Sequence, residues 1–223
     1  MTIARPVQTS LVEGMERPVG PILPSVFTGT NADLMAAVAP LYLTGSVLDV
    51  TYGGGKWWDR FTPEPFTAHD LYKLDGVDFR ALPEADGSVD TVCFDPPYVL
   101  SGGKSSAKIA DGEFQGRFGI GHREKGVTGW AALMDLLRGG VSEACRVSSR
   151  FVLVKCMEFA QGNNELKDPP TEATMHARSL GWHLHDRIVH HTGSGPGGHN
   201  IFDVKRARRH HSYLLVFAKG GAS

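Results

Sequence analysis

The sequence has few cysteines, almost no net charge and no long apolar run. Its three cysteines, Cys93, Cys145 and Cys156, lie far apart without CxxC spacing, which excludes a disulfide framework and favours buried, reduced thiols. No apolar run approaches the roughly 20 residues of a membrane span, and residues 1–20 contain no apolar segment of a secretion signal. We therefore expect a cytoplasmic protein with no membrane partner.

The formal net charge of -1 counts against a protein that coats nucleic acid by charge alone. Basic residues nevertheless gather in two stretches, 102–125 and 205–211. These stretches provide candidate nucleic-acid contacts, with solvated loop charges as the alternative interpretation. The candidates are Lys104, Lys108, Arg117, Arg206, Arg208 and Arg209.

A chain of 223 residues, 41% hydrophobic and 21% charged, is typical of one globular domain with a substantial core. Helical and strand patterns alternate along it, which favours a parallel sheet flanked by helices, and the last two strands read as an antiparallel hairpin. The predicted fold is α/β, a single domain with a doubly wound, mainly parallel seven-stranded sheet and an antiparallel C-terminal hairpin. The expected strands cover 47–50, 66–71, 76–82, 89–94, 150–157, 182–190 and 211–218, and the expected helices 32–43, 56–61, 130–145 and 170–180.

Local signals also divide the chain into an arm, a domain and two long loops. Residues 1–26 are dotted with proline and lack periodicity, so we expect an extended arm before a domain at 27–220. Segments 99–127 and 193–210 are polar and rich in glycine, and both follow predicted strands. Long loops inside a compact domain are usually functional or disordered, so these two are the expected substrate loops.

A glycine-rich turn follows the first of these strands. Asp49 ends the strand, and Gly53 and Gly55 form a G-x-G pattern in which the missing side chains let a ligand approach the backbone. Trp58 takes the place of the last glycine of the dinucleotide fingerprint, so a ligand without phosphates is favoured. Asp70 lies about 20 residues after Asp49, where an acid can accept both ribose hydroxyls, although it is also a plausible turn residue.

Residues 95–98 read Asp-Pro-Pro-Tyr and follow the apolar run 89–94. This arrangement places a carboxylate, a backbone carbonyl and an aromatic ring at the end of a parallel strand. The two oxygens can accept hydrogen bonds from an exocyclic amine, and the ring can stack on a planar base. The alternative is a strand exit turn with a buried tyrosine. The candidate catalytic residues are Asp95, Pro96, Pro97 and Tyr98.

The tetrapeptide resembles the catalytic motif of the S-adenosylmethionine-dependent amino-methyltransferases that modify adenine N6 or cytosine N4. Segment 47–55 resembles the first cofactor motif of class I methyltransferases, and 78–90 resembles the third. Segment 211–219 is similar to the closing strand of the family, although Ser212 stands where an acid is usual. The resemblance implies a Rossmann-like fold and S-adenosyl-L-methionine as cofactor. It implies cofactor contacts by Asp49, Thr51, Gly53, Gly55, Asp70, Asp78 and Phe79, with Trp57 and Trp58 either closing over the cofactor or lying in the core.

The same resemblance implies a mechanism. Asp95 and the Pro96 carbonyl would accept hydrogen bonds from the target amine, whose lone pair could then point at the sulfonium methyl group. The prolines would hold these acceptors in place through their fixed φ. Tyr98 would stack on the base, which has to be flipped out of a duplex or supplied single-stranded.

Several substrates are compatible with this resemblance. A leading aspartate favours adenine N6 in DNA, whereas cytosine-N4 enzymes more often begin the motif with serine and glutamine-amide enzymes with asparagine. An RNA amine, or a catalytically silent nucleic-acid-binding subunit, is the further alternative. The chain has no room for a separate recognition domain, so recognition would come from the two loops or a partner chain. A homo-oligomer is the other expected partner arrangement. Paired histidines at 183–185, 190–191 and 210–211 lack companions at zinc spacing, and we expect no metal site.

Overall fold

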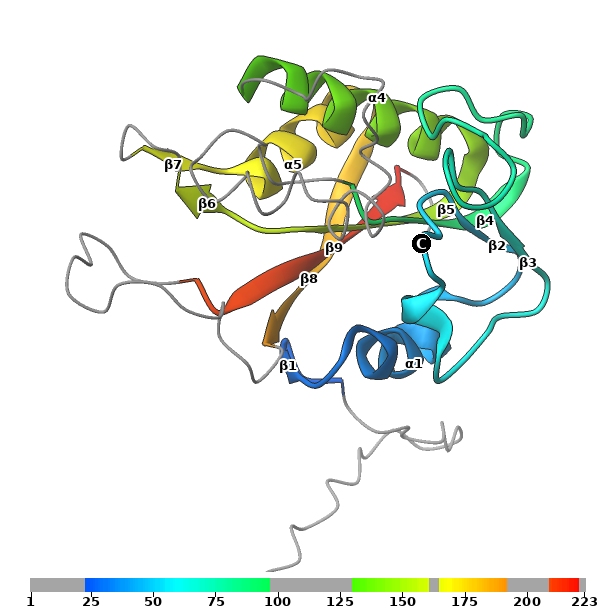
Figure 1. The fold of residues 1–223 in the computed structure, drawn as a ribbon, viewed down its shortest axis with the longest axis horizontal. Coiled ribbons are helices and arrows are strands. Elements are labelled where there is room, and N and C mark those ends of the chain that lie inside the picture. The colour runs from blue at the N-terminus through cyan, green and yellow to red at the C-terminus, as the bar shows by residue number, and fades with distance from the viewer. Residues whose placement is uncertain (1–22, 97–129, 161–164, 192–208, 221–223) are drawn as a thin grey trace, which may run out of the picture.

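The computed structural model describes residues 23–96, 130–160, 165–191 and 209–220. Their centre is a seven-stranded sheet with the strand order β1-β8-β9-β5-β4-β2-β3 (Figure 1). All neighbouring pairs are parallel except those that β9 forms with β5 and β8. The predicted mainly parallel sheet with an antiparallel C-terminal hairpin is therefore confirmed. The strands are β1 (Val26–Thr28), β2 (Val47–Asp49), β3 (Phe66–Ala68), β4 (Val89–Phe94), β5 (Ser148–Cys156), β8 (Trp182–His191) and β9 (His211–Lys219).

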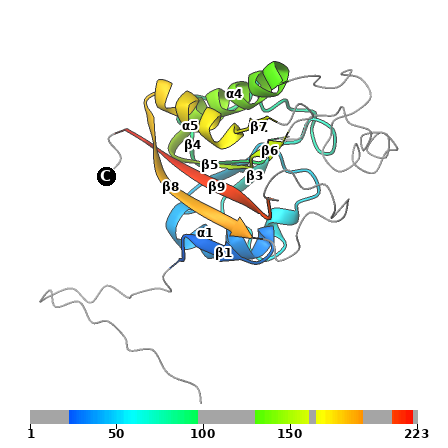
Figure 2. The same ribbon diagram turned by 90° about the vertical axis from the view of Figure 1, so that its left-hand side faces the viewer.

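Helices cover both faces of the sheet. Figures 1 and 2 show α4 (Trp130–Val147) and α5 (Pro169–Ser179) on one face and α1 (Asn31–Tyr42) on the other. A short 3-10 helix, η1 (Lys56–Trp58), packs beside α1. A separate two-stranded sheet joins β6 (Phe159–Ala160) to β7 (Leu166–Lys167). Among the described helices, none has the length and apolar character that a membrane span requires.

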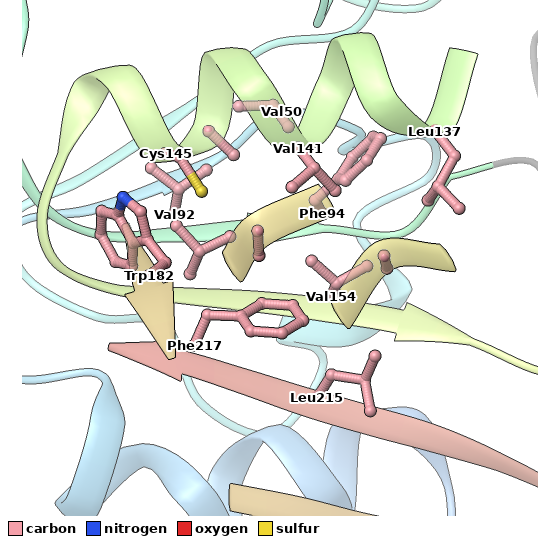
Figure 3. Close-up of a cluster of buried hydrophobic side chains, with 14 of the residues drawn as sticks. Val50, Val92, Phe94, Leu137, Val141, Cys145, Val154, Trp182, Leu215 and Phe217 are labelled. Carbon is pink, nitrogen blue, oxygen red and sulfur yellow. The ribbon is translucent and has the colours of Figure 1, made fainter. Parts of the chain in front are cut away.

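The sheet separates two hydrophobic cores. On the α4 side, Leu137 and Val141 pack over Val92 and Phe94 of β4 (Figure 3). The other core joins α1 and η1 to the opposite face of the same strands. Because side chains alternate along a strand, Val154 of β5 enters the α4 core while its neighbours face α1.

Thr30 caps the start of α1. The Thr30 hydroxyl accepts a hydrogen bond from the Asp33 backbone N at 3.1 Å, and the Asp33 carboxylate accepts one from the Thr30 backbone N at 3.0 Å. This reciprocal pair is a capping box. The buried stripe of the helix continues from Leu34 and Val38 to Tyr42. Leu41 lies off this face and is 50% exposed.

One expected strand is absent. Residues 76–82 form a turn, closed by a 2.9 Å hydrogen bond from the Ala81 N–H to the Asp78 carbonyl, instead of pairing with the sheet. The seventh strand is β1, which pairs in parallel with β8. Its first residue, Val26, lies in the segment expected to be an arm, so the expected domain boundary at 27 falls inside a strand. Three residues are too few to show a period, so local pattern could not reveal this strand.

Candidate functional site

The carboxyl ends of β2, β3, β4 and β5 meet at one edge of the sheet, because these strands are parallel neighbours. Ligands of open α/β sheets bind at this edge. Asp49 ends β2 and is followed by the glycine turn, Asp70 lies just after β3, and Asp95 and Pro96 follow β4 directly. Asp78 and Phe79 lie further along the connection between β3 and β4. The fold therefore brings residues expected to bind the cofactor close to those expected to perform catalysis.

Asp49 at the end of β2 organises the turn that follows. Its side chain is 3% exposed and accepts hydrogen bonds from Trp58 Nε1 at 2.7 Å and from the Thr51 backbone N at 2.9 Å. Burial raises the pKa of Asp49 to about 7, although these two hydrogen bonds oppose the shift. Trp57 and Trp58 are buried against α1, so the core interpretation holds for both and Trp58 also anchors Asp49.

Both glycines of the G-x-G pattern have left-handed backbone angles, with φ of 57° at Gly53 and 68° at Gly55. A Cβ atom at Gly55 would lie 2.6 Å from the Tyr52 hydroxyl. Position 55 therefore requires glycine because its backbone is left-handed and because a side chain would collide with Tyr52, in addition to any contact with a ligand. Gly54 is exposed, and a Cβ there would meet no atom within 4 Å.

Asp70 joins the glycine turn to the loop after β3. Its Oδ2 accepts a hydrogen bond from the Gly53 N–H at 2.7 Å, and its Oδ1 accepts from the Tyr72 and Lys73 N–H groups at 2.9 and 2.7 Å. Asp70 thus acts as a turn residue and also lies beside the G-x-G pattern. Its role as a ribose acceptor stays a prediction.

His69 was not identified from the sequence, yet it holds the loop that carries Asp70. Its side chain is buried between two carboxylates, with Nδ1 bonded to Asp75 and Nε2 bonded to Glu84 at 2.7 Å. Burial lowers the pKa of His69, but the two acids outweigh this and leave it above the usual value. Asp75 and Glu84 follow His69 in the connection between β3 and β4 at separations of 6 and 15 residues, which match no helix or strand period.

The third motif forms a surface ion pair. The Asp78 carboxylate bonds the Arg80 guanidinium, with Arg80 Nε 3.0 Å from Oδ1, and this pairing holds the pKa of Asp78 below its usual range. Phe79 packs against Phe94 with ring centroids 5.0 Å apart. Contacts of Asp78 and Phe79 with an adenine ring stay a prediction. To make such a contact, the Asp78 carboxylate would have to release Arg80 and bind the ligand instead.

Asp95 follows β4 and lies beside the cofactor turn. Its backbone N–H donates to Thr51 Oγ1 at 2.8 Å, which links the turn after β2 to the first residue of the tetrapeptide. Its Oδ1 is buried and accepts no hydrogen bond from the described residues. Burial raises the pKa of Asp95 to about 6, against the positive charge of Lys155. Pro96 is buried, and Pro97 and Tyr98 lie outside the described residues.

The predicted nucleic-acid contacts fall almost entirely outside the described residues. Lys104, Lys108, Arg117, Arg206 and Arg208 lie there, as do nearly all residues of the two expected substrate loops. Arg209 is described and precedes β9 with a partly buried side chain.

Two minor expectations concern cysteine and histidine. Cys93, Cys145 and Cys156 are free and buried, as expected, and burial raises the pKa of each thiol. His190 is fully buried and its Nε2 bonds the Gly29 carbonyl at 2.9 Å, which is a packing role. In the part of the chain that the structure describes, no three His, Cys, Asp or Glu side chains are grouped to hold a metal ion.

Comparisons with known proteins give structural neighbours only. No protein-family model and no curated protein matches the sequence. The structure is similar to TTHA0409, a candidate DNA modification methylase from Thermus thermophilus, with 17% identity, a TM-score of 0.43 and coverage of 66% of this chain and 53% of that one. The chain therefore spans about half the length of that protein.

Two further neighbours are methyltransferases by name. Magnesium protoporphyrin IX methyltransferase from Synechocystis PCC 6803, solved with bound S-adenosylmethionine, has 8% identity, a TM-score of 0.41 and coverage of 84% of this chain and 79% of that one. PH1948 from Pyrococcus horikoshii, a candidate RNA methyltransferase, has 13% identity, a TM-score of 0.44 and coverage of 84% and 82%. At these identities and TM-scores the likenesses carry no argument about function, which has to come from the site.

Proposed function

We propose that the chain is an S-adenosylmethionine-dependent methyltransferase that acts on the exocyclic amine of a nucleobase. The observation that carries this proposal is the 2.8 Å hydrogen bond between the Asp95 N–H and Thr51 Oγ1. It ties a glycine turn suited to a cofactor to a carboxylate suited to an amine, at the ligand-binding edge of an α/β sheet. A transfer reaction needs a cofactor site and an acceptor site in contact, and this bond supports the proposal that the two sites lie together here.

The charge of the site suits this cofactor. Asp49, Asp70 and Asp95 surround the glycine turn, and Gly54 leaves open space on its exposed side. Carboxylates favour ribose hydroxyls, an ammonium group and a sulfonium, whereas they repel the phosphates of a dinucleotide. When bound, S-adenosylmethionine supplies an electrophilic methyl group, and Asp49 and Asp70 hold the turn against which it would lie.

The acceptor side of the site requires a hydrogen-bond donor. The buried Oδ1 of Asp95 has no partner among the described residues, and an unsatisfied buried polar atom costs about 1–3 kcal/mol. An amine N–H of adenine or cytosine would satisfy it, with the Pro96 carbonyl as a second acceptor. With a pKa of about 6, Asp95 is mostly ionised at neutral pH and accepts rather than donates. Two such acceptors would turn the amine lone pair toward the methyl group.

The substrate that we propose is adenine N6 in DNA, because the tetrapeptide begins with aspartate. The base would be flipped or single-stranded and would stack on Tyr98. The segments 99–127 and 193–210 would contact the nucleic acid, together with a partner chain or a second copy of this chain. Methylation of cytosine N4 or of an RNA amine, the alternative reactions, would proceed by the same chemistry. A catalytically silent subunit, the remaining alternative, would transfer no methyl group.

The test is a methyl-transfer assay with tritiated S-adenosylmethionine, offered unmethylated genomic DNA and total RNA in parallel. Mass spectrometry of the digested product identifies the nucleoside, and Asp95→Ala serves as the control. N6-methyladenine in DNA, absent with the variant, is the expected result. Label in RNA or in N4-methylcytosine would keep the chemistry and replace the substrate. If no nucleic acid is labelled although S-adenosylhomocysteine binds in calorimetry, the assignment of the acceptor is wrong.

A further inference from the structure

A lysine is buried within the site that we propose. Lys155 belongs to β5 and is only 4% exposed to solvent. Lysine is almost never fully buried unless a partner compensates its charge. Alternation along β5 directs Lys155 to the α1 side of the sheet, opposite Val154 and Cys156. A charge in this position needs an explanation that packing does not provide.

Lys155 has a hydrogen-bond partner and a charge partner. Its ammonium donates to the side-chain oxygen of Asn31, at the first turn of α1. The register Phe94↔Val154 between β4 and β5 places Asp95 beside Lys155 at the same edge of the sheet. Burial lowers the pKa of Lys155 and raises that of Asp95, and the charge of each residue opposes this effect of burial on the other.

The other groups around this pair do not replace the lysine. Asp49 of β2 faces Asp95 with a like charge, which adds to the effect of burial in raising the pKa of Asp49. Cys156 of β5 and His190 of β8 are held neutral, because burial raises the pKa of the thiol and lowers that of the imidazole. Among the described residues, Lys155 is therefore the cation that offsets the buried charge of Asp95 at this edge.

We propose that Lys155 is a positioning residue for methyl transfer, whose buried ammonium keeps the Asp95 carboxylate ionised and able to accept the amine N–H. This inference rests on the proposed function for its catalytic consequence. Lys155 acts through Asp95 and does not itself contact the reacting atoms. Its bond to Asn31 fixes the ammonium at the N-terminal end of α1.

The first test compares pH profiles of kcat/KM for the wild type, Lys155→Met and Lys155→Arg. Methionine keeps the length and apolar stem of the side chain, and arginine keeps the charge. Removing the cation raises the pKa of Asp95, so the acid limb of Lys155→Met should move up by about one pH unit. At about pH 9 its activity should return to within about threefold of the wild type. The acid limb of Lys155→Arg should stay close to that of the wild type.

Asn31→Ala is the matched control, because it removes the hydrogen bond and leaves the charge. Its acid limb should remain in place even if its activity falls. A loss in Lys155→Met that is uniform across pH, or an Lys155→Arg variant as defective as Lys155→Met, would overturn the proposal and leave Lys155 a structural residue.

A second measurement does not depend on turnover. The 13C resonance of the Asp95 carboxyl carbon, assigned with Asp95→Asn, reports its ionisation in folded wild type and in Lys155→Met. A midpoint raised by about one unit supports the inference even if no nucleic acid is methylated, and an unchanged midpoint refutes it. Thermal unfolding of each variant verifies that the titrated protein is folded, and Lys155→Gln replaces Lys155→Met if the latter is not.

Discussion

Replacing Thr51 by valine tests the link between the two halves of the site. Valine has the shape of threonine and lacks only the hydroxyl, which accepts the Asp95 N–H at 2.8 Å. The variant leaves a partly buried backbone donor without its partner, at a cost of about 1–3 kcal/mol. For a domain of this size, that corresponds to a fall in Tm of roughly 2–4 °C per kcal/mol.

The effect on activity should exceed the effect on stability. Without the Thr51 hydroxyl, the start of the tetrapeptide is free to move away from the glycine turn, and a displacement of about 1 Å can cost a hundredfold in rate. We therefore expect kcat for methyl transfer to fall by about one to two orders of magnitude, with little change in the affinity for S-adenosylhomocysteine measured by calorimetry.

Thr51→Ser is the control, because serine keeps the hydroxyl and loses the methyl group. It should retain most of the activity. If Thr51→Val has a kcat within twofold of Thr51→Ser, the hydrogen bond does not align the site and the argument for the proposed function loses its main support.

Three further predictions follow from the geometry of the site. Asp95→Ala should abolish methyl transfer while S-adenosylhomocysteine still binds; activity within tenfold of the wild type would remove Asp95 from catalysis. Gly55→Ala should destabilise the protein by about 1–3 kcal/mol in urea unfolding, since its backbone is left-handed and the Cβ would meet Tyr52, and adding Tyr52→Ala should recover part of the loss. Asp49 has a folded pKa of about 7 against a reference value of 3.8, so its contribution to stability is complete below the lower value and is lost as pH rises through the higher one. The unfolding free energy of the wild type relative to Asp49→Asn should therefore decrease between about pH 5 and pH 8, and a constant difference would contradict the raised pKa.

Most elements of the fold could be predicted because their signals are local. Proline at the start and Gly181 after the end bracket α5, and an apolar run marks β5. The sequence also predicted that a glycine turn follows β2 and that Asp95 follows β4, and the structure places both there. Such signals depend only on a residue and its near neighbours in the chain, so they can be recognised from the sequence alone.

Local signals failed where pairing or packing decides the outcome. β1 is too short to show the alternation of apolar and polar residues that marks a strand. It is a strand because it pairs with the edge of β8. In residues 76–82, Val77, Phe79 and Leu82 pack on the core, yet the segment forms a turn closed by the bond from the Ala81 N–H to the Asp78 carbonyl. His69 gains its two acidic partners only when the connection between β3 and β4 is folded.

The sequence by itself therefore determined the order of the elements, the glycine turn after β2 and the carboxylate that follows β4. Only the tertiary structure decided that β2 and β4 are neighbours, which brings Thr51 to Asp95 across 44 residues, and that β5 places Lys155 beside the same carboxylate. The physical reason is that periodicity and turn chemistry act over a few residues, whereas the pairing of strands and the burial of charge depend on contacts that exist only after the chain has folded.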